Sequence, residues 1–318
     1  MNLYLETLGY TANIVAPIFF ILLLGYLLRR TRLLDEAFVA TGSRLVFVIA
    51  LPALVFMSIA RMDFHAVFNP QQLGYVLITI LLAFALIWWL AARWIEAPED
   101  LGVFIQGAFR SNYGVIGLAV SFNLFGQEGL AHASLLLALV IPLFNVLSIV
   151  CLSVPLQRSA AMRLSDTLLE IVKNPLILAV LFALPLSWFG VQLPGIVART
   201  GDYLTNLALP LALLTIGASL NLKSLHDTST LAFWASALKL VILPLVLTLG
   251  AWLYGFEGQA LAILMVLFGC PTAAVSFVMA KAMGGNAQLA ANIVLTTTLG
   301  SMLTLSSGIF LLRLLGVI

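Results

Sequence analysis

The chain carries very little charge. Only 9% of its 318 residues are Asp, Glu, Lys or Arg, whereas 62% are hydrophobic. Soluble proteins have about 25% charged and about 45–50% apolar residues. So few charged side chains cannot cover a surface that faces water, and the mean hydropathy of +1.12 agrees. The composition therefore excludes a soluble enzyme or binding domain and predicts that most of the chain lies in lipid.

Cysteine and clustered basic residues are also scarce. The two cysteines, Cys151 and Cys270, lie far apart inside apolar runs, a pattern that indicates neither a disulfide framework nor a zinc site. The net charge is only +2, and the basic residues are scattered singly or in short loops rather than along a stripe. We therefore expect no nucleic-acid partner, no metal site and no cofactor.

Long apolar runs are what the sequence does contain. A membrane-spanning helix needs about 20 mostly apolar residues. Ten such windows occur, at residues 11–28, 37–60, 72–95, 101–123, 130–155, 167–188, 203–220, 229–254, 258–281 and 287–312. The loops between them are short, so no soluble domain is expected. The predicted fold class is an all-α integral membrane protein with ten transmembrane helices.

The basic residues predict how these helices are oriented, because cytoplasmic loops are rich in Lys and Arg. If the N-terminus lies outside, the outer side holds only Arg61, Arg199 and Arg313. The inner loops then hold ten basic residues: Arg29, Arg30, Arg32, Arg44, Arg93, Arg158, Arg163, Lys173, Lys223 and Lys281. We expect a multi-pass membrane protein with both termini outside the cytoplasm.

The two halves of the chain share a pattern at a constant offset of 158 residues. The matched pairs are Pro17 with Pro175, Ala50-Leu51-Pro52 with Ala208-Leu209-Pro210, Trp94 with Trp252, and Glu99 with Glu257. Prolines also recur simply because membrane helices tolerate them, but that alternative does not explain the shared spacing. We predict two five-helix repeats, residues 1–157 and 158–318, with matched kinks at Pro52 and Pro210. An odd number of spans makes the halves inverted, as in many secondary transporters.

The fourth and ninth spans hold equivalent places in the two repeats, and both look interrupted. The fourth has Arg110, Ser111 and Asn112 near its middle, among glycines, and a charged side chain at that depth is costly unless it faces a polar cavity. The ninth has Cys270-Pro271-Thr272, where the proline removes a backbone donor. We predict that both spans unwind at mid-membrane, where irregular backbone is tolerated only against protein or a wet cavity.

Unwinding at both places predicts an anion site. Half-helix N-termini carry partial positive charge and free N–H groups, and Arg110 adds a full charge. A carboxylate is the simplest ligand for that combination. The candidate site residues are Arg110, Ser111, Asn112, Tyr113, Gly114, Asn145, Cys270, Pro271, Thr272 and Ser276.

Each of these residues also has a simpler interpretation. Arg110 could snorkel from a misplaced span edge, and Pro271 could be a mere kink. Thr272 and Ser276 could bond back to their own helix. Lys239 could pair with an unwound carbonyl, line the cavity or snorkel.

Three further expectations concern polar groups near these spans. Asn145 is expected to bond the unwound backbone of the fourth span. Glu99 and Glu257 are expected to cap the two broken helices. The histidines are expected at interfaces rather than in a proton relay.

Several of these motifs resemble the bacterial auxin efflux carrier family. They are the run from Arg110 to Gly114 followed by Gly117, then Gly126 with Glu128-Gly129-Leu130, Pro142-Leu143 with Asn145, Pro271, and the opening with Pro17 and Gly25-Tyr26 before Arg29. The likeness covers essentially the whole chain.

The resemblance implies a ten-helix fold shared with plant PIN carriers and distantly with bile acid:sodium symporters. In it, helices 1, 2, 6 and 7 form a scaffold, and helices 3–5 and 8–10 form a transport domain in which helices 4 and 9 cross. It also implies elevator-like transport of organic anions, such as auxin-like acids or malonate. Related folds often pair through the scaffold, which would give a homodimer.

Two features depart from these relatives. Residues 157–166 are all that stands where plant PIN carriers have a long hydrophilic loop, so nothing supports regulation by its phosphorylation. Ser111-Asn112 resembles part of the sodium site of bile acid symporters, but the fixed charge of Arg110 could replace that cation. We therefore predict transport without a dedicated metal site, driven by the proton gradient, the membrane potential or a counter-ion.

Three alternatives remain. One is a sodium-coupled symporter of the bile acid type. The second is an intramembrane enzyme, but the sequence has no HExxH motif and no paired intramembrane aspartates. The third is a channel, which is usually built from symmetric subunits rather than from an internal inverted repeat. The sequence therefore favours a secondary transporter of small organic anions.

Overall fold

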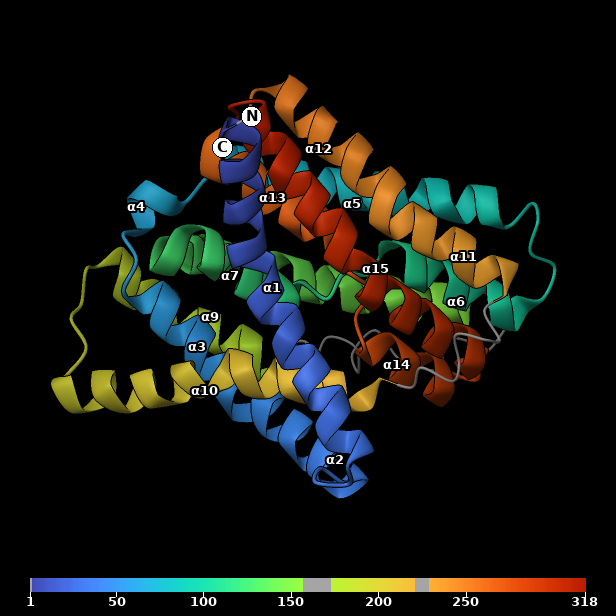
Figure 1. Ribbon diagram of the computed structural model, residues 1–318, viewed down its shortest axis with the longest axis horizontal. Helices are drawn as coiled ribbons and strands as arrows, with labels where there is room; N and C mark the ends of the chain where they lie inside the picture. Colours follow the sequence, from blue (N-terminus) through green and yellow to red (C-terminus); the bar gives the residue numbers. More distant parts are fainter. Residues whose placement is uncertain (1, 157–172, 221–228) are drawn as a thin grey trace.

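The computed structural model describes residues 2–156, 173–220 and 229–318, and their regular structure is helical (Figure 1). The first half contains α1 (Asn2–Arg30), α2 (Glu36–Leu45), a π-helical turn η1 (Val46–Ala50), α3 (Leu51–Ala60), α4 (Phe64–Val67), α5 (Pro70–Ala91), α6 (Pro98–Phe109), a second π-helical turn η2 (Tyr113–Gly117) and α7 (Leu118–Ser153). The second half contains α9 (Pro175–Trp188), α10 (Gly195–Ser219), α11 (Thr230–Ala237), η4 (Leu238–Ile242), α12 (Leu243–Tyr254), α13 (Gly258–Gly269), α14 (Val275–Met283) and α15 (Ala287–Leu314).

Six helical stretches of the described chain are long and apolar enough to cross a membrane. They are Leu5–Arg30, Glu36–Ala60, Pro70–Ala91, Tyr113–Ser153, Thr230–Tyr254 and Ala287–Leu314. Each of the ten predicted windows overlaps helix, although residues 167–172 of the sixth lie outside the described ranges. The all-α membrane class is therefore confirmed, whereas the count of ten spans and the inverted repeat stay predictions.

Sequence signals explain where many helices begin. Asp35, Asn69, Asn174, Ser229 and Asn286 each precede a helix and accept a hydrogen bond from a backbone N–H of its first turn. These residue types are preferred at N-caps because their side-chain oxygens satisfy an N–H that has no partner within the helix. Proline follows directly at Pro70 and Pro175, where the first turn needs no backbone donor.

The two matched prolines have different surroundings. Pro52 lies in the first turn of α3, and the π-helical turn η1 ends directly before that helix. A widened helical turn therefore precedes Pro52, which has no backbone N–H to donate. Pro210 lies inside α10, whose helix runs from Gly195 to Ser219. Gly126 marks the junction of the predicted fourth and fifth spans: it is the single non-helical residue within α7, with φ 61° and ψ −143°.

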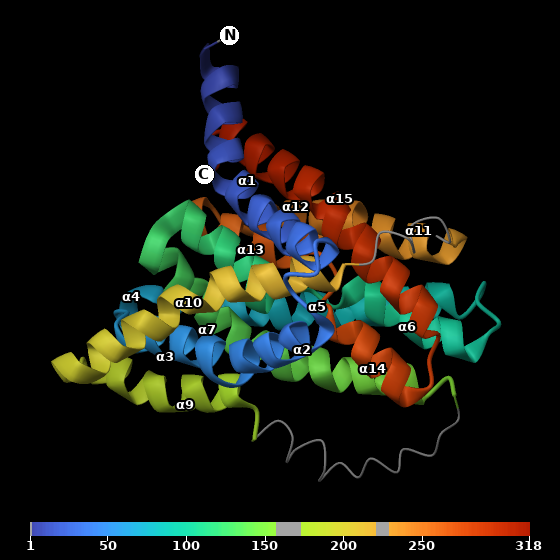
Figure 2. The same cartoon turned by 60° about the horizontal axis from the view of Figure 1, so that its bottom comes forward.

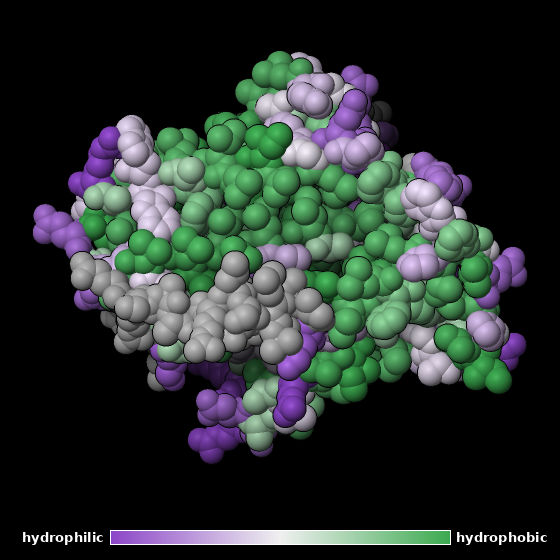
Figure 3. All heavy atoms as spheres, turned by 180° about the vertical axis from the view of Figure 1, so that it is seen from behind, coloured by the Kyte–Doolittle hydropathy of each residue, from purple (hydrophilic) through white to green (hydrophobic). Residues whose placement is uncertain are grey.

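The helices form two groups. Figures 1 and 2 show α3, α9 and α10 gathered on one side of the molecule and α6, α11 and α14 on the other. α1 packs along α10 so closely that a Cβ on Gly25 would collide with the carbonyl oxygen of Leu214, and one on Gly217 with that of Leu22. Small residues allow such close backbone approach between membrane helices. Figure 3 shows a broad hydrophobic surface with hydrophilic residues gathered near its margins, as expected for a lipid-facing protein.

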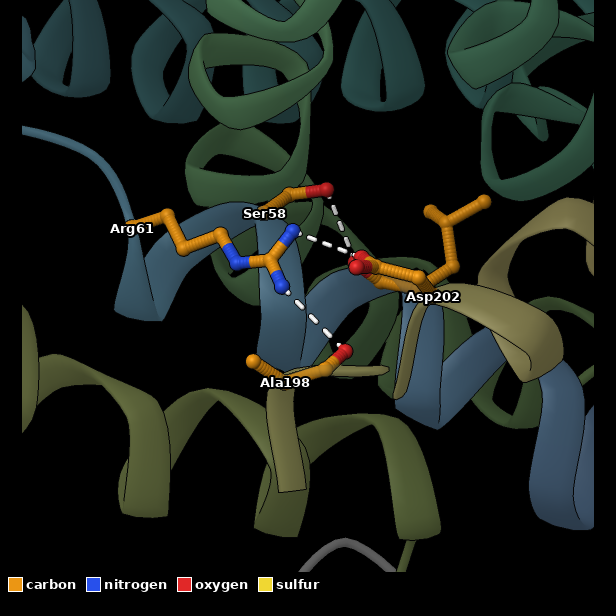
Figure 4. A network of polar contacts seen from close by, with 5 residues as sticks. Ser58, Arg61, Ala198 and Asp202 are labelled. Carbon is orange, nitrogen blue, oxygen red and sulfur yellow. Dashed lines mark hydrogen bonds and ion pairs between the residues drawn. The ribbon is translucent and has the colours of Figure 1, made fainter. Parts of the chain in front are cut away.

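Polar contacts join segments near the helix ends. The Arg61 guanidinium, just beyond α3, donates to a carboxylate oxygen of Asp202 at 2.6 Å and to the carbonyl oxygen of Ala198, both on α10 (Figure 4). The Arg313 guanidinium, near the end of α15, lies 3.4 Å from the ring centroid of Tyr10 in α1. The first and last helices therefore meet near the chain termini, which lie at the same end of the molecule in Figures 1 and 2.

Candidate functional site: the crossing of two interrupted helices

The two predicted breaks occur and meet each other. α6 ends at Phe109 and α13 at Gly269, and the next residues, Arg110 and Cys270, have extended backbone conformations. Ser111 and Thr272 then form an isolated antiparallel bridge. The backbone N–H of Asn112 donates to the carbonyl oxygen of Pro271 at 2.7 Å. The two extended segments therefore satisfy part of each other's backbone, as buried irregular chain requires.

Two hydroxyl groups cap the interrupted helices reciprocally. Ser111 Oγ, which follows α6, donates to the carbonyl oxygen of Leu267 in α13 at 2.7 Å. Thr272 Oγ1, which follows α13, donates to the carbonyl oxygen of Gly107 in α6 at 2.6 Å. Each hydroxyl therefore satisfies a carbonyl in the last turn of the other helix, where intrahelical donors run out. Thr272 thus reaches across the crossing and does not bond back to its own helix.

Arg110 is buried beside the crossing, with 7% of its surface exposed, so it does not snorkel to an interface. Its Nη1 donates to the carbonyl oxygen of Phe144, to Ser148 Oγ and to Met279 Sδ, at 3.2, 2.7 and 3.3 Å. Its Nη2 donates to Asn145 Oδ1 at 2.8 Å. Asn145 therefore bonds the arginine side chain, and the expectation that it bonds the backbone of the fourth span is wrong.

The arginine keeps donors for a ligand. A guanidinium has five N–H groups, and the acceptors given above account for those of Nη1 and one of Nη2. Nε has no acceptor among the described residues. All four acceptors are neutral, and the buried residues of the described chain include two cations, Arg110 and Lys239, but no Asp or Glu. Within the described part of the chain, no acidic side chain therefore compensates the positive charge of the site.

A cavity of about 410 Å³ opens beside Arg110, between the two groups of helices. Of the candidate residues, it is lined by Arg110, Ser111, Asn112, Tyr113, Gly114 and Asn145. The other candidates, Cys270, Pro271, Thr272 and Ser276, are buried at the crossing and do not line it. Ala273, Ala274 and Val275 line it instead, where α14 begins. The first turn of a helix presents free backbone N–H groups, so this edge of the cavity suits an anion.

The opposite wall comes from the other helix group. Ser43 and Phe47 of the α2–η1 segment, Asn174 before α9, and Ala212 and Thr215 of α10 line it. These residues were not predicted, because nothing in a single sequence pairs them with the fourth span. Ser148 and Met279, which hold Arg110 from α7 and α14, were not predicted either. Ser148 lies one turn after Asn145, and that helical spacing was the available signal.

Other polar groups near the crossing have clear positions. Lys239 is buried, and its Nζ donates to the carbonyl oxygen of Phe268 at 2.7 Å. Of the three alternatives given for this lysine, the structure shows the pairing with a carbonyl at the break. Neither Glu99 nor Glu257 makes a capping hydrogen bond, although both lie at helix starts. Glu257 is nevertheless the N-cap residue of α13 and Glu99 lies in the first turn of α6, which are the positions where negative charge is favoured.

Two more polar side chains lie away from solvent. His132 is buried against Gln72, so the expectation of an interfacial position is wrong for this histidine. Ser276 Oγ is buried and has no hydrogen-bond partner within the described residues, so it does not bond back to its own helix.

Comparison with known proteins gives one family for nearly the whole chain. The model of a family described as membrane transport protein matches residues 11–308. Curated relatives match over similar lengths. An "Uncharacterized transporter" of Methanothermobacter thermautotrophicus is 24% identical over 300 residues, which cover 94% of this chain and 97% of the relative.

Two bacterial relatives are similar to the same extent. A protein of Rhizobium meliloti named "Putative malonate transporter" is 25% identical, and the match covers 95% of each chain. The "Uncharacterized transporter YfdV" of Escherichia coli is 24% identical, with 94% of this chain and 96% of the relative covered.

Proposed function

Because the chain belongs to the membrane transport protein family, which is the auxin efflux carrier family that its motifs resemble, we propose that it is a secondary active transporter of small organic anions. Membership makes it a transporter and not an enzyme. We further propose a substrate class, a place where the substrate binds and the movement that carries it.

The observation that carries the anion proposal is the uncompensated charge of Arg110 at the cavity wall. Neutral acceptors on α7 and α14 hold its guanidinium, and N–H groups remain for a substrate. The start of α14, at Ala273 to Val275, adds backbone N–H groups at the same cavity. A carboxylate fits this pair of features, because guanidinium and helix N-termini both bind oxyanions well.

The cavity also limits the substrate's size. At about 410 Å³ it falls within the usual range of small-molecule sites. Aliphatic and aromatic side chains such as Leu137, Val140 and Phe144 form much of its lining. We propose small carboxylates as substrates, either malonate, as in the name of the Rhizobium relative, or auxin-like acids with an apolar part.

We propose that the chain folds as two inverted five-helix repeats with ten spans. Matching helix lengths support this: α6 and α13 have 12 residues each, and the α2–α3 stretch and α10 have 25 each. Contacts near helix ends support it too. Arg61 meets Asp202, Gln72 meets Ala260, and Asn286 meets Asp100, and each pair is assigned to one membrane side by the ten-span scheme. The meeting of Tyr10 with Arg313 fits an even number of spans.

The position of the cavity supports an elevator-like movement. It lies between α2, η1, α9 and α10 on one side and the interrupted helices with α7 on the other. The proposed cycle moves helices 3–5 and 8–10 as one body past the scaffold of helices 1, 2, 6 and 7. Dimerisation through that scaffold, residence in the bacterial inner membrane and outside termini belong to the same proposal.

We propose that transport is driven by the proton gradient, the membrane potential or a counter-ion. The alternative is that the protein is a sodium-coupled symporter. The positive charge of Arg110 beside Ser111 and Asn112 favours the first set, because a fixed cation already stands next to the carboxylate site.

Reconstitution into liposomes tests the function. Counterflow of labelled malonate should be saturable, and a panel of carboxylates and amino acids, with and without pH and sodium gradients, should reveal substrate and drive. Arg110→Ala should abolish counterflow, and Arg110→Lys should weaken it about tenfold or more, because a lysine loses the planar fork. The matched control is Arg199→Lys, an exposed arginine in α10. Counterflow by Arg110→Ala at the wild-type rate would overturn the site.

A further inference from the structure

Lys239 is a second buried cation at the crossing, and the proposed anion site does not use it. It lies in η4 with 2% of its surface exposed, outside the residues that line the large cavity. Its Nζ has one acceptor among the described residues, the carbonyl oxygen of Phe268. A buried ammonium is costly without a counter-charge, and no Asp or Glu belongs to the buried part of the described chain. Something at this place must therefore favour a positive charge.

The C-terminal end of α13 supplies that preference. In its last turn the carbonyl oxygen of Val266 accepts from a backbone N–H, that of Leu267 from a hydroxyl, and that of Phe268 from the Lys239 ammonium. A helix C-terminus carries about half a negative charge, which favours a cation at this place. Arg110 holds the corresponding place at the end of α6, where it is the first residue after the helix. A basic residue thus stands beside the end of each interrupted helix, but only Lys239 donates to a carbonyl of the helix end, because the Arg110 guanidinium donates to α7 and α14.

Space beside the ammonium is very small. A cavity of about 20 Å³ lies between Lys239 and the rings of Phe109, Phe144 and Phe268. That is close to the volume needed for one water molecule. Shortening Lys239 to alanine would enlarge the space next to the Phe268 carbonyl by the volume of the lost side chain. The enlarged space would suit a small cation, because a carbonyl oxygen at a helix C-terminus faces it.

We propose that Lys239 is a tethered cation that takes the place of a freely binding coupling cation at the end of α13. This inference rests on the proposed function, since it explains how such a carrier works without sodium. The ammonium stabilises the crossing in every state of the cycle, so the wild-type protein has no need of a bound alkali metal. Removing the ammonium converts a built-in charge into an empty cation site that a small free cation can fill.

Two variants of Lys239 separate charge from shape. Lys239→Ala removes the charge and leaves space, whereas Lys239→Met removes the charge and fills the space. Both should have a lower unfolding temperature than the wild type in detergent with choline as the only cation. Methylammonium or sodium should raise the unfolding temperature of Lys239→Ala but not that of Lys239→Met. Lys281→Ala, which changes an exposed lysine of α14, is the control and should respond to no cation.

Transport gives the second readout. Counterflow by Lys239→Ala should fall about tenfold or more in choline, because a hydrogen bond from a charged donor is lost, and methylammonium should restore much of it. The wild type should transport equally well in sodium and in choline.

Three results would overturn the inference. One is a Lys239→Met protein as stable and active as the wild type, because the charge would then be dispensable. Another is a destabilised Lys239→Ala protein that no small cation restores. The last is stimulation of the wild type by sodium. Failure of the wild type to transport any carboxylate would instead refute the proposed function, while the unfolding measurements, which use no substrate, would still decide the role of Lys239.

Discussion

At the scale of single residues, two hydroxyl groups join the interrupted helices. Removing Ser111 Oγ leaves the carbonyl oxygen of Leu267 without its shortest donor, and removing Thr272 Oγ1 does the same to Gly107. We expect Ser111→Ala and Thr272→Val each to lower the free energy of unfolding by about 1–3 kcal/mol, the usual cost of a buried acceptor left unpaired. Equilibrium unfolding in mixed micelles measures it.

The control for these variants is Ser306→Ala. Ser306 Oγ also donates to a helix carbonyl, that of Met302, but the residue is only half-buried and its hydrogen bond is exposed, so the bond does not lie in a packed crossing. Its loss should cost no more than about 0.5 kcal/mol. If all three variants unfold alike, the reciprocal caps do not hold the crossing together.

The residue types at the crossing were readable from the sequence, but their partners were not. A mid-span arginine is costly in a lipid-facing helix, and a mid-span proline removes a backbone donor, so Arg110 and Pro271 identify the breaks. The acceptors of Arg110 lie on α7 and α14, and the choice between a backbone and a side-chain partner for Asn145 depends on packing. Such pairings need tertiary geometry, which periodicity and residue type do not contain.

At the scale of elements, one glycine lets α7 change direction. Gly126 has φ 61° and ψ −143°, a region that is essentially restricted to glycine. A Cβ there would meet no atom within 4 Å, so the penalty for Gly126→Ala is conformational and not steric. We expect this substitution to lower the free energy of unfolding by about 1–3 kcal/mol.

Gly74→Ala is the matched control for Gly126→Ala. Gly74 lies inside α5, and a Cβ there also meets no atom within 4 Å, but its backbone is helical. Alanine at this position should stabilise the helix by up to about 1 kcal/mol. Opposite signs for the two substitutions, measured in the same unfolding assay, are the expected result, and equal effects would contradict the strained turn.

Helix ends in the sequence had two kinds of signal. Asx and Ser residues before an apolar run predict helix starts from local hydrogen bonding, and the structure has them at Asn69, Asn174 and Ser229. The acidic residues Glu99 and Glu257 lie at helix starts, as expected from their charge, but they make no capping hydrogen bond. Charge alone is therefore a weaker indicator of a cap than an N-cap residue.

At the scale of the whole molecule, composition alone identifies the membrane class, because so few charged side chains cannot cover a surface that faces water. The grouping of helices around the cavity was not readable in the same way. It depends on which helices touch, as in the close approach of α1 and α10 at Gly25 and Gly217. Only the resemblance to a known family supplied a prediction of that grouping, and the division into a scaffold and a transport domain stays a prediction.

Inversion of the two halves makes a prediction that labelling can check. Thr31 and Phe189 lie 158 residues apart, each just after the first helix of its half, and both are exposed. If the halves are inverted, these two places lie on opposite sides of the membrane. The basic residues around Thr31 predict that it lies in the cytoplasm.

In intact cells an impermeant maleimide should therefore label Phe189→Cys and not Thr31→Cys, whereas both should react after lysis. The native Cys151 and Cys270 are buried, so background labelling should be low. Labelling of both positions from one side would refute inversion, and labelling of Thr31→Cys alone would reverse the orientation.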